Sequence, residues 1–237
     1  MRVPSEAQLL ALWEQGLRRH PVDRALLLCA WARPDIAGAG LAALPLGAVN
    51  AALLRLREAC FGAGIEAYVD CPRCGERLGL VLDARELLAG AAEGDGRADL
   101  ELAGLRFRVP CSRDLAVVAG TAGDGEAAAH RLLELCCLEA GNLPSGQLVE
   151  LLAEVEPGLA ALDPAADISL ALACESCGHG WAADFDIGAL LWEEIEARAR
   201  GLLAEIHGLA RAYGWTEPEI LALSPERRAT YLELAGA

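Results

Sequence analysis

The sequence predicts an α+β protein that is mainly helical, with one small antiparallel sheet. Apolar residues recur at helical spacing near both ends of the chain and in its middle. Two stretches of alternating apolar and polar residues each carry a C-x-x-C pair, and a third contains a two-residue turn signal. We therefore expect five parts: N-terminal helices (1–62), a first cysteine knuckle and a β-hairpin (63–110), a helical insertion (111–164), a second knuckle (165–188), and a long helix with short capped helices (189–237).

Composition supports a helical fold and a protein partner. Of the 237 residues 54% are hydrophobic, but only 5% are aromatic, and Ala and Leu dominate. This mixture favours helices over sheet. All 20 basic residues are Arg, and they stand against 35 acidic residues, which gives a net charge of −15. Such a surface repels nucleic-acid phosphates and anionic membranes.

The N-terminus and the cysteines indicate a cytoplasmic protein. Glu6 and Glu14 interrupt the first apolar stretch, so it does not read as a secretory signal. The apolar run at 24–32 is too short to span a bilayer. Nine cysteines, with Cys136 and Cys137 adjacent in a helical pattern, read as reduced thiols rather than a disulfide framework.

Residues 5–61 are expected to form helices. Ser5 and Gln8 make a capping box before the first. Asp23 is expected to cap a second helix, which stops before Pro34. A third helix ends at Gly62.

The next segments are extended. Alternating apolar residues predict a strand that runs into Cys71 and another that follows Cys74, and residues 90–98 read as a loop. A turn at Ala103 and Gly104 predicts a hairpin in which one face is apolar and the other carries opposite charges. The predicted opposite pairs are Leu102–Leu105, Leu100–Phe107, Glu101–Arg106 and Asp99–Arg108.

Residues 112–160 are again expected to be helical, with a loop at 120–125 and an end marked by Pro157, Gly158, Asp163 and Pro164. An extended segment (168–174) follows. A long helix over about 190–213, roughly 36 Å at 1.5 Å per residue, ends at Gly214. Two capped restarts follow, at Thr216 and at Ser224.

The two C-x-x-C stretches are copies of one unit. CPRCGERLGLVLDARELL and CESCGHGWAADFDIGALL align without gaps, at a constant offset of 103 residues from Cys71 to Cys174. Cys74 then matches Cys177, and a glycine follows each pair. Each copy reads as strand, cysteine turn, strand and helix start.

Two such turns supply four thiolates, the set that tetrahedral Zn²⁺ prefers. Glycine after the second cysteine lets backbone amides point at the sulfur. We therefore predict one structural zinc ion in a zinc-ribbon-like arrangement, held by Cys71, Cys74, Cys174 and Cys177. The long insertion between the two C-x-x-C turns adds little entropic cost, because the cost of closing a loop grows only with the logarithm of its length.

Other readings of the four cysteines are weaker. A redox C-x-x-C opens a helix, whereas a strand follows here. A c-type haem needs a histidine where Gly178 stands, and four buried thiols remain the plain alternative. His179 is read as a turn residue. The remaining cysteines lack partners at ligand spacing and are read as small core residues: Cys29, Cys60, Cys111, Cys136 and Cys137.

A filled Cys₄ shell has no open position for a substrate, so such sites are structural. Motifs for phosphate binding, metalloprotease or serine-hydrolase chemistry are missing from the sequence. We expect no catalytic residue, no small-molecule substrate and no enzyme activity. The alternative is a zinc-ribbon nucleic-acid-binding regulator with a helix-turn-helix-like tail, but its basic patch, Arg227 and Arg228, is small in a chain this acidic.

The C-terminal run from Leu190 to Ala235 resembles the ending of T4-like phage baseplate proteins, a family encoded with contractile tails and related injection systems. Some members are described as baseplate hub assembly chaperones. Segments 45–62, 107–119 and 162–174 are also similar to that family. The matching C-terminal residues are His207, Tyr213-Gly214-Trp215, Glu219-Ile220-Leu221, Arg227-Arg228 and Tyr231.

The resemblance implies a chaperone or built-in component that binds baseplate hub, spike or other tail proteins. The apolar stripe of the long helix either receives a partner helix or packs on the N-terminal helices, and the second reading is favoured. Trp215 and the Arg227/Arg228 patch are then the expected exposed anchors. The full set of candidate partner-binding residues is His207, Tyr213, Trp215, Arg227, Arg228 and Tyr231.

Overall fold

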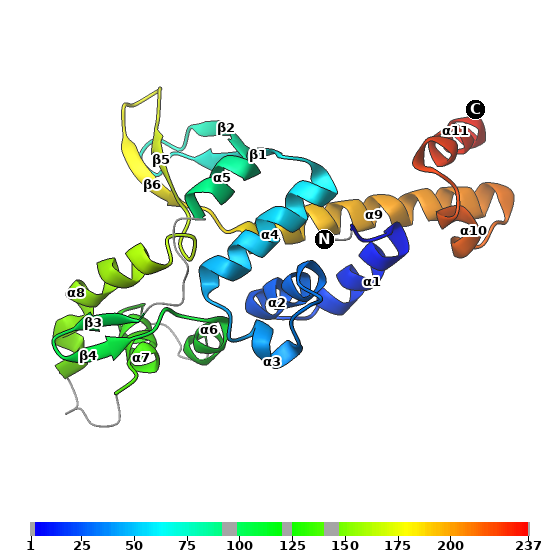
Figure 1. Cartoon of the computed structure of the whole chain (residues 1–237). Helices are drawn as coiled ribbons and strands as arrows, with labels where there is room; N and C mark the ends of the chain where they lie inside the picture. Colours follow the sequence, from blue (N-terminus) through cyan, green and yellow to red (C-terminus); the bar gives the residue numbers. More distant parts are fainter. Residues whose placement is uncertain (1–2, 92–98, 120–124, 140–146, 237) are drawn as a thin grey trace.

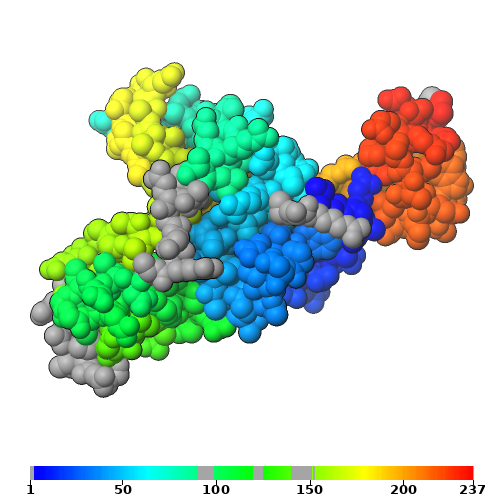
Figure 2. Space-filling model, viewed as in Figure 1, coloured from blue at the N-terminus to red at the C-terminus, as the bar shows by residue number. Residues whose placement is uncertain are grey.

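The computed structural model describes residues 3–91, 99–119, 125–139 and 147–236. Its parts are arranged around one long helix, α9 (Ile187–Tyr213) (Figure 1). The N-terminal helices lie along the first half of α9, and two strand hairpins stand to one side of them. The helical insertion lies at one end of the molecule, and the last two helices form a separate knob at the other (Figure 2).

The N-terminal helices form largely as predicted. The capping box of Ser5 and Gln8 opens the first helix. The second helix, however, is capped by His20, whose Nδ1 accepts from the Val22 amide at 3.3 Å. Pro21 suits the first helical position, so Asp23 falls inside the first turn and the prediction that it is the cap is wrong. The bounds are α1 (Glu6–Gly16), α2 (Pro21–Ala32), α3 (Gly38–Leu41) and α4 (Leu46–Phe61).

The main core lies between α1, α2, α4 and α9. Leu53, Leu191 and Leu202 have no exposed surface. The α9 stripe faces this core, as the favoured interpretation predicts. Its sixth member, Tyr213, is exposed, and the other five are buried: Leu191, Ile195, Leu202, Ile206 and Leu209. Within the described residues, no helix is both long and apolar enough to cross a bilayer.

The strands of the described residues form three separate two-stranded antiparallel sheets. The prediction of one small sheet that includes the β-hairpin is therefore wrong. That hairpin packs its apolar face on a second core inside the insertion, built around Phe107, Leu133 and Val155. The sheets are β1 (Gly64–Asp70) with β2 (Arg77–Asp83), β3 (Leu100–Leu102) with β4 (Leu105–Phe107), and β5 (Ser169–Ala173) with β6 (Gly180–Asp184).

The β3–β4 register confirms three of the four predicted pairs. Ala103 and Gly104 both have positive φ, 52° and 77°, as a type I′ turn requires. The predicted pairing of Asp99 with Arg108 is wrong. Arg108 pairs instead with the buried carboxylate of Asp114 at 2.6 Å.

The described part of the insertion contains three helices, and α5 (Ala84–Ala91) precedes the insertion. The helix α8 runs past Pro157 to Leu162, further than expected. Gly158 lets it approach the β-hairpin, because a Cβ at this position would lie 2.7 Å from Leu100. The predicted loops fall partly on residues 92–98 and 120–124, outside the described residues. The insertion helices are α6 (Ser112–Val118), α7 (Gly125–Cys136) and α8 (Gln147–Leu162).

The insertion is fastened to the start of α4. Pro45 is the N-cap and offers no side-chain acceptor. Asp163, 116 positions after Gly47, supplies the acceptor: its carboxylate accepts from the Gly47 amide at 2.9 Å. The Asn50 side chain donates to the carbonyl oxygen of Ala165 at 2.8 Å. These contacts hold residues 163–168, the strap that leads from α8 to β5, against α4.

The C-terminal elements follow the predicted caps. Gly214 ends α9 in the left-handed conformation, with φ 72°. Thr216 and Glu219 form a capping box for α10 (Glu217–Leu221), and α11 (Pro225–Gly236) follows Ser224. Both short helices pack back on the distal half of α9.

Candidate metal centre

The two C-x-x-C turns fold as the repeat predicts, with the same backbone pattern. The Cys71 amide donates to the Glu76 carbonyl at 2.8 Å, and the Gly75 amide donates back to the Cys71 carbonyl at 2.9 Å. The second turn repeats both bonds at 2.9 and 2.8 Å, five and four residues from Cys174. Gly75 and Gly178 both have positive φ, 74° and 69°, which only glycine adopts without strain.

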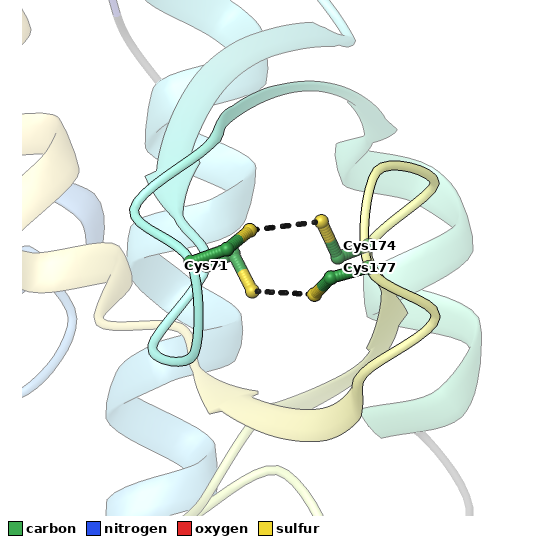
Figure 3. Close-up of side chains that lie close together, drawn as sticks. Cys71, Cys174 and Cys177 are labelled. Atoms are coloured by element: carbon green, nitrogen blue, oxygen red, sulfur yellow. Dashed lines mark hydrogen bonds between the residues drawn. The ribbon is translucent and has the colours of Figure 1, made fainter.

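The two turns face each other and bring four sulfurs together (Figure 3). The Sγ atoms of Cys71 and Cys177 lie 3.8 Å apart, and those of Cys74 and Cys174 lie 3.7 Å apart. All four sulfurs lie within 4.8 Å of one another. A disulfide needs about 2.0 Å between sulfurs, so these are four separate thiols.

The spacing of the sulfurs fits a tetrahedral metal. Four thiolates at a Zn–S distance of about 2.3 Å stand about 3.8 Å apart at the corners of a tetrahedron, close to the two cross-turn distances. The site is therefore compatible with a structural zinc ion. Among the described residues, this is the one group of three or more potential ligands whose donor atoms lie this close together.

The site is shielded on one side and open on the other. Cys71 and Cys174, the first cysteine of each turn, are 2% and 1% exposed. Cys74 is exposed and Cys177 is half-buried. The first cysteines thus tie each turn to the protein, and the second ones close the cluster from the solvent side.

The backbone favours negative charge on Cys71. Burial works to raise the pKa of this thiol, but hydrogen bonds from the backbone amides of Cys74 and Arg73, helped by the neighbouring thiols, lower that pKa to about 7. The amides reach the sulfur because of the tight turn, as the glycine position predicts.

The second cysteines behave in the opposite way. The backbone amide of Glu76 works to lower the pKa of Cys74, but hydrogen bonds with the other thiols, together with burial, raise it to about 12. At Cys177 the amide of His179 has the same lowering effect, yet the pKa is raised by burial and by nearby thiols. Four thiols this close compete for negative charge, and a bound divalent cation would let all four ionise.

A buried arginine anchors the start of the β1–β2 hairpin, which carries the first turn, to the helices. Arg57 of α4 is 4% exposed and holds Glu194 of α9 with two of its nitrogens, at 2.7 and 3.0 Å. It also donates to the carbonyls of Gly62 and Gly64, where β1 begins. Sequence reasoning missed this pair. The sequence carries little signal for it, because Arg57 stands in RLRE (55–58), a charged stretch of the helix.

The second turn is attached through the start of α9. The Phe185 amide donates to the Ile168 carbonyl at 2.8 Å and closes the base of the β5–β6 hairpin. Asp186 then caps α9 through the Ala189 amide at 3.0 Å. The β1–β2 and β5–β6 hairpins are therefore both anchored to the α4–α9 pair. The cysteine sulfurs join the two hairpins at the end away from these helices.

The other cysteines and His179 lie outside the cluster, as predicted. Cys60 is half-buried and the other four are buried, and all five are free thiols: Cys29, Cys60, Cys111, Cys136 and Cys137. Burial raises the pKa of Cys136 to about 12, so this thiol is protonated at neutral pH. His179 sits in the second turn, where its ring stacks on Trp181 with centroids 5.8 Å apart.

The prediction that Arg228 is an exposed anchor is wrong. Its side chain has no exposed surface and donates to Glu6, Glu205 and the Leu223 carbonyl. Both carboxylates also pair with Arg198, so two arginines and two glutamates form one network. Arg228 therefore fastens α11 to α9 and α1, because a buried guanidinium needs this many acceptors.

The other candidate partner residues fall into two groups. His207 and Arg227 are exposed, and Tyr213 is 38% exposed. Trp215 and Tyr231 are half-buried and pack on the main core. Tyr213 stacks on Trp215 with centroids 4.6 Å apart, and its hydroxyl donates to the Tyr231 carbonyl at 3.1 Å. The three rings thus form a cluster at the end of α9, and the Tyr213 ring is the one at the surface.

No family model, curated protein or solved structure matches the chain.

Proposed function

We propose that this chain is a non-enzymatic, zinc-stabilised protein that acts by binding other proteins during assembly of the baseplate or tail of a contractile phage or injection system. Its partners are hub, spike or other tail subunits. The observation that carries the proposal is the resemblance of the run from Leu190 to Ala235 to T4-like baseplate proteins.

The position of that run supports a role in protein binding. Residues 190–235 form most of α9, the whole of α10 and all but the last residue of α11. The last two helices project from the body as a knob (Figure 2). His207, Tyr213 and Arg227 lie on the surface of this run. A helical knob held by an internal ion network presents a rigid surface to a partner, and preorganisation favours affinity.

Zinc in the four-cysteine cluster would act as a clasp. Its chemical contribution is to neutralise four thiolates and bind them together. The chain's own part is to bring two turns, 103 positions apart, to one place and aim backbone amides at the sulfurs. Four protein ligands fill a tetrahedral shell, so the clasp suits a structural role and not catalysis.

Burial of Arg228 also favours a protein partner over nucleic acid. Only Arg227 of the C-terminal basic patch is exposed, because Arg228 is buried in ion pairs with Glu6 and Glu205. A net charge of −15 repels a phosphate backbone.

Copurification from the native gene cluster tests the proposal. Recovery with unassembled hub or spike subunits, and absence from finished particles, supports a chaperone. Presence in finished particles supports a built-in component. Recovery with neither, or salt-sensitive binding to DNA, would contradict the proposal.

A further inference from the structure

Two adjoining hollows lie beside the start of α4. One, of about 370 Å³, is bounded by α2, α4, α6 and the start of α9. The other, of about 290 Å³, lies between α4, α7 and α8. They share the residues Leu46, Ala166 and Asp167. The shared wall makes them neighbouring sites.

The walls of both hollows are mainly apolar. Trp192 and Phe185 line the larger one, and Leu132 and Leu159 line the smaller one. Each is large enough to receive an apolar side chain, and the volumes are near the lower end of the range for binding pockets. Burial of apolar area in such hollows is the main source of affinity in protein recognition.

The charged residues around the hollows are almost all acidic. Among the described residues, none of the six carboxylates that line them forms an ion pair: Glu156, Asp163, Asp167, Asp184, Asp186 and Glu193. The single cation in the walls, Arg24, is already engaged. It donates to the carbonyls of Gly16 and Leu17 and lies over the Trp192 ring at 4.6 Å.

We propose that these two hollows together, the α4 cleft, bind an amphipathic basic segment of a partner protein. Apolar side chains one or two helical turns apart enter the hollows. Arg or Lys residues of the same segment pair with the four exposed carboxylates of this set that do not cap a helix: Glu156, Asp167, Asp184 and Glu193. The aliphatic stems of those basic residues cover the apolar rim. The proposal rests on the proposed function in that the partner is a protein, and it adds where that partner binds and what its chemistry is.

A designed peptide of 18 residues provides the probe, with Leu at positions i, i+3, i+4 and i+7 and Arg or Lys elsewhere, and a fluorescent label. Its counterpart replaces every basic residue by Glu. Fluorescence anisotropy with the full chain should show saturable binding of the basic peptide that weakens as salt rises. Absence of binding, or equal binding of the acidic counterpart, would overturn the proposal.

Charge reversal separates the α4 cleft from the general acidity of the surface. Glu156→Arg, Asp167→Arg and Glu193→Arg together should raise the Kd for the basic peptide by about tenfold or more. The matched control reverses Glu14, Glu66 and Glu86, which are also exposed and lie outside both hollows. An equal loss of affinity in the control would show non-specific attraction and sink the proposal.

Filling the hollows tests the apolar half of the proposal. Ala160→Phe on α8 and Ala189→Phe on α9 place rings at exposed positions in the walls. Together they should weaken binding about tenfold and leave its salt dependence unchanged. Ala153→Phe and Ala197→Phe, on the same two helices but outside the hollows, are the controls. Equal affinity in the filled variant would rule out the hollows as the binding site.

Two further outcomes separate this proposal from others. If an apolar dye binds the hollows and the basic peptide does not displace it, the hollows are small-molecule sites and the proposal fails. If native subunits copurify equally well with the filled and charge-reversed variants, the proposed function stands and the α4 cleft is not its binding surface.

Discussion

The guanidinium of Arg228 donates to the carboxylate of Glu6 at 2.6 Å, joining residues 222 positions apart. Glu6 lies in the first turn of the first helix and Arg228 in the last helix. Glu205 on α9 accepts from the same arginine at 2.8 Å. This contact places the C-terminal knob relative to the N-terminus, so the two ends of the chain stabilise one another.

Loss of that arginine is expected to destabilise the protein. Arg228→Ala leaves two carboxylates that are about three-quarters buried (26% exposed side chains), with Arg198 as their remaining partner. We expect a loss of about 2–3 kcal/mol in the free energy of unfolding, measured by urea denaturation. Arg227→Ala, one position away and exposed, should change stability by about 0.5 kcal/mol or less. Equal effects of the two substitutions would contradict the assigned role of Arg228.

The zinc proposal predicts about one metal ion per chain. Elemental analysis of purified protein should find it, and Cys174→Ser should lose it. Because structural zinc contributes roughly 10–16 kcal/mol in small peptides, the variant should unfold at clearly lower temperature. Cys60→Ser, a half-buried thiol outside the cluster, should keep the metal. A metal-free wild type that is as stable as the metal-bound protein would refute a structural clasp.

We predict that alanine substitutions at two helical glycines change the stability of the protein in opposite directions. A Cβ at Gly16 would stand 2.2 Å from the Trp192 ring, so Gly16→Ala should destabilise the protein by about 1–3 kcal/mol. Gly201 in α9 has nothing within 4 Å of that position, and Gly201→Ala should stabilise by about 0.5–1 kcal/mol. Thermal unfolding followed by circular dichroism measures both. A stable Gly16→Ala variant would contradict the packing of α1 on α9.

The Arg108–Asp114 pair should give the insertion a dependence on pH. Burial works to raise the pKa of Asp114, but hydrogen bonds from Arg108 and the Cys111 amide outweigh it and lower that pKa below its usual value. The ionised pair therefore adds stability that is complete above about pH 4 and is lost as pH falls through the folded pKa.

Asp114→Asn tests this pair. At pH 7 the variant should lose about 2–3 kcal/mol in the free energy of unfolding, and the difference from wild type should shrink towards pH 3. Asp99→Asn, whose contact with Arg106 is long at 3.9 Å, is the control and should differ little from wild type at either pH. A difference for Asp114→Asn that persists unchanged at pH 3 would contradict an ionic origin.

Short-range patterns were readable from the sequence. The capping box at Ser5, the left-handed stop at Gly214 and the pairing of Leu102 with Leu105 each depend on residues a few positions apart. The four-cysteine cluster was also readable, although its halves are far apart, because the unit is repeated and each copy carries its own turn glycine. The chemistry of four thiolates then requires the copies to meet.

What the sequence could not decide was which distant groups meet. Arg228 looks like a surface residue in its own helix, and it is buried only because Glu6 and Glu205 surround it. Asp163 caps α4 because the strap after α8 crosses the helix start, and the β3–β4 hairpin stays apart from the cysteine strands because its apolar face has a core of its own in the insertion. A local pattern fixes the conformation of a segment and the face it buries. Long-range packing determines what covers that face and where a charge finds its partner.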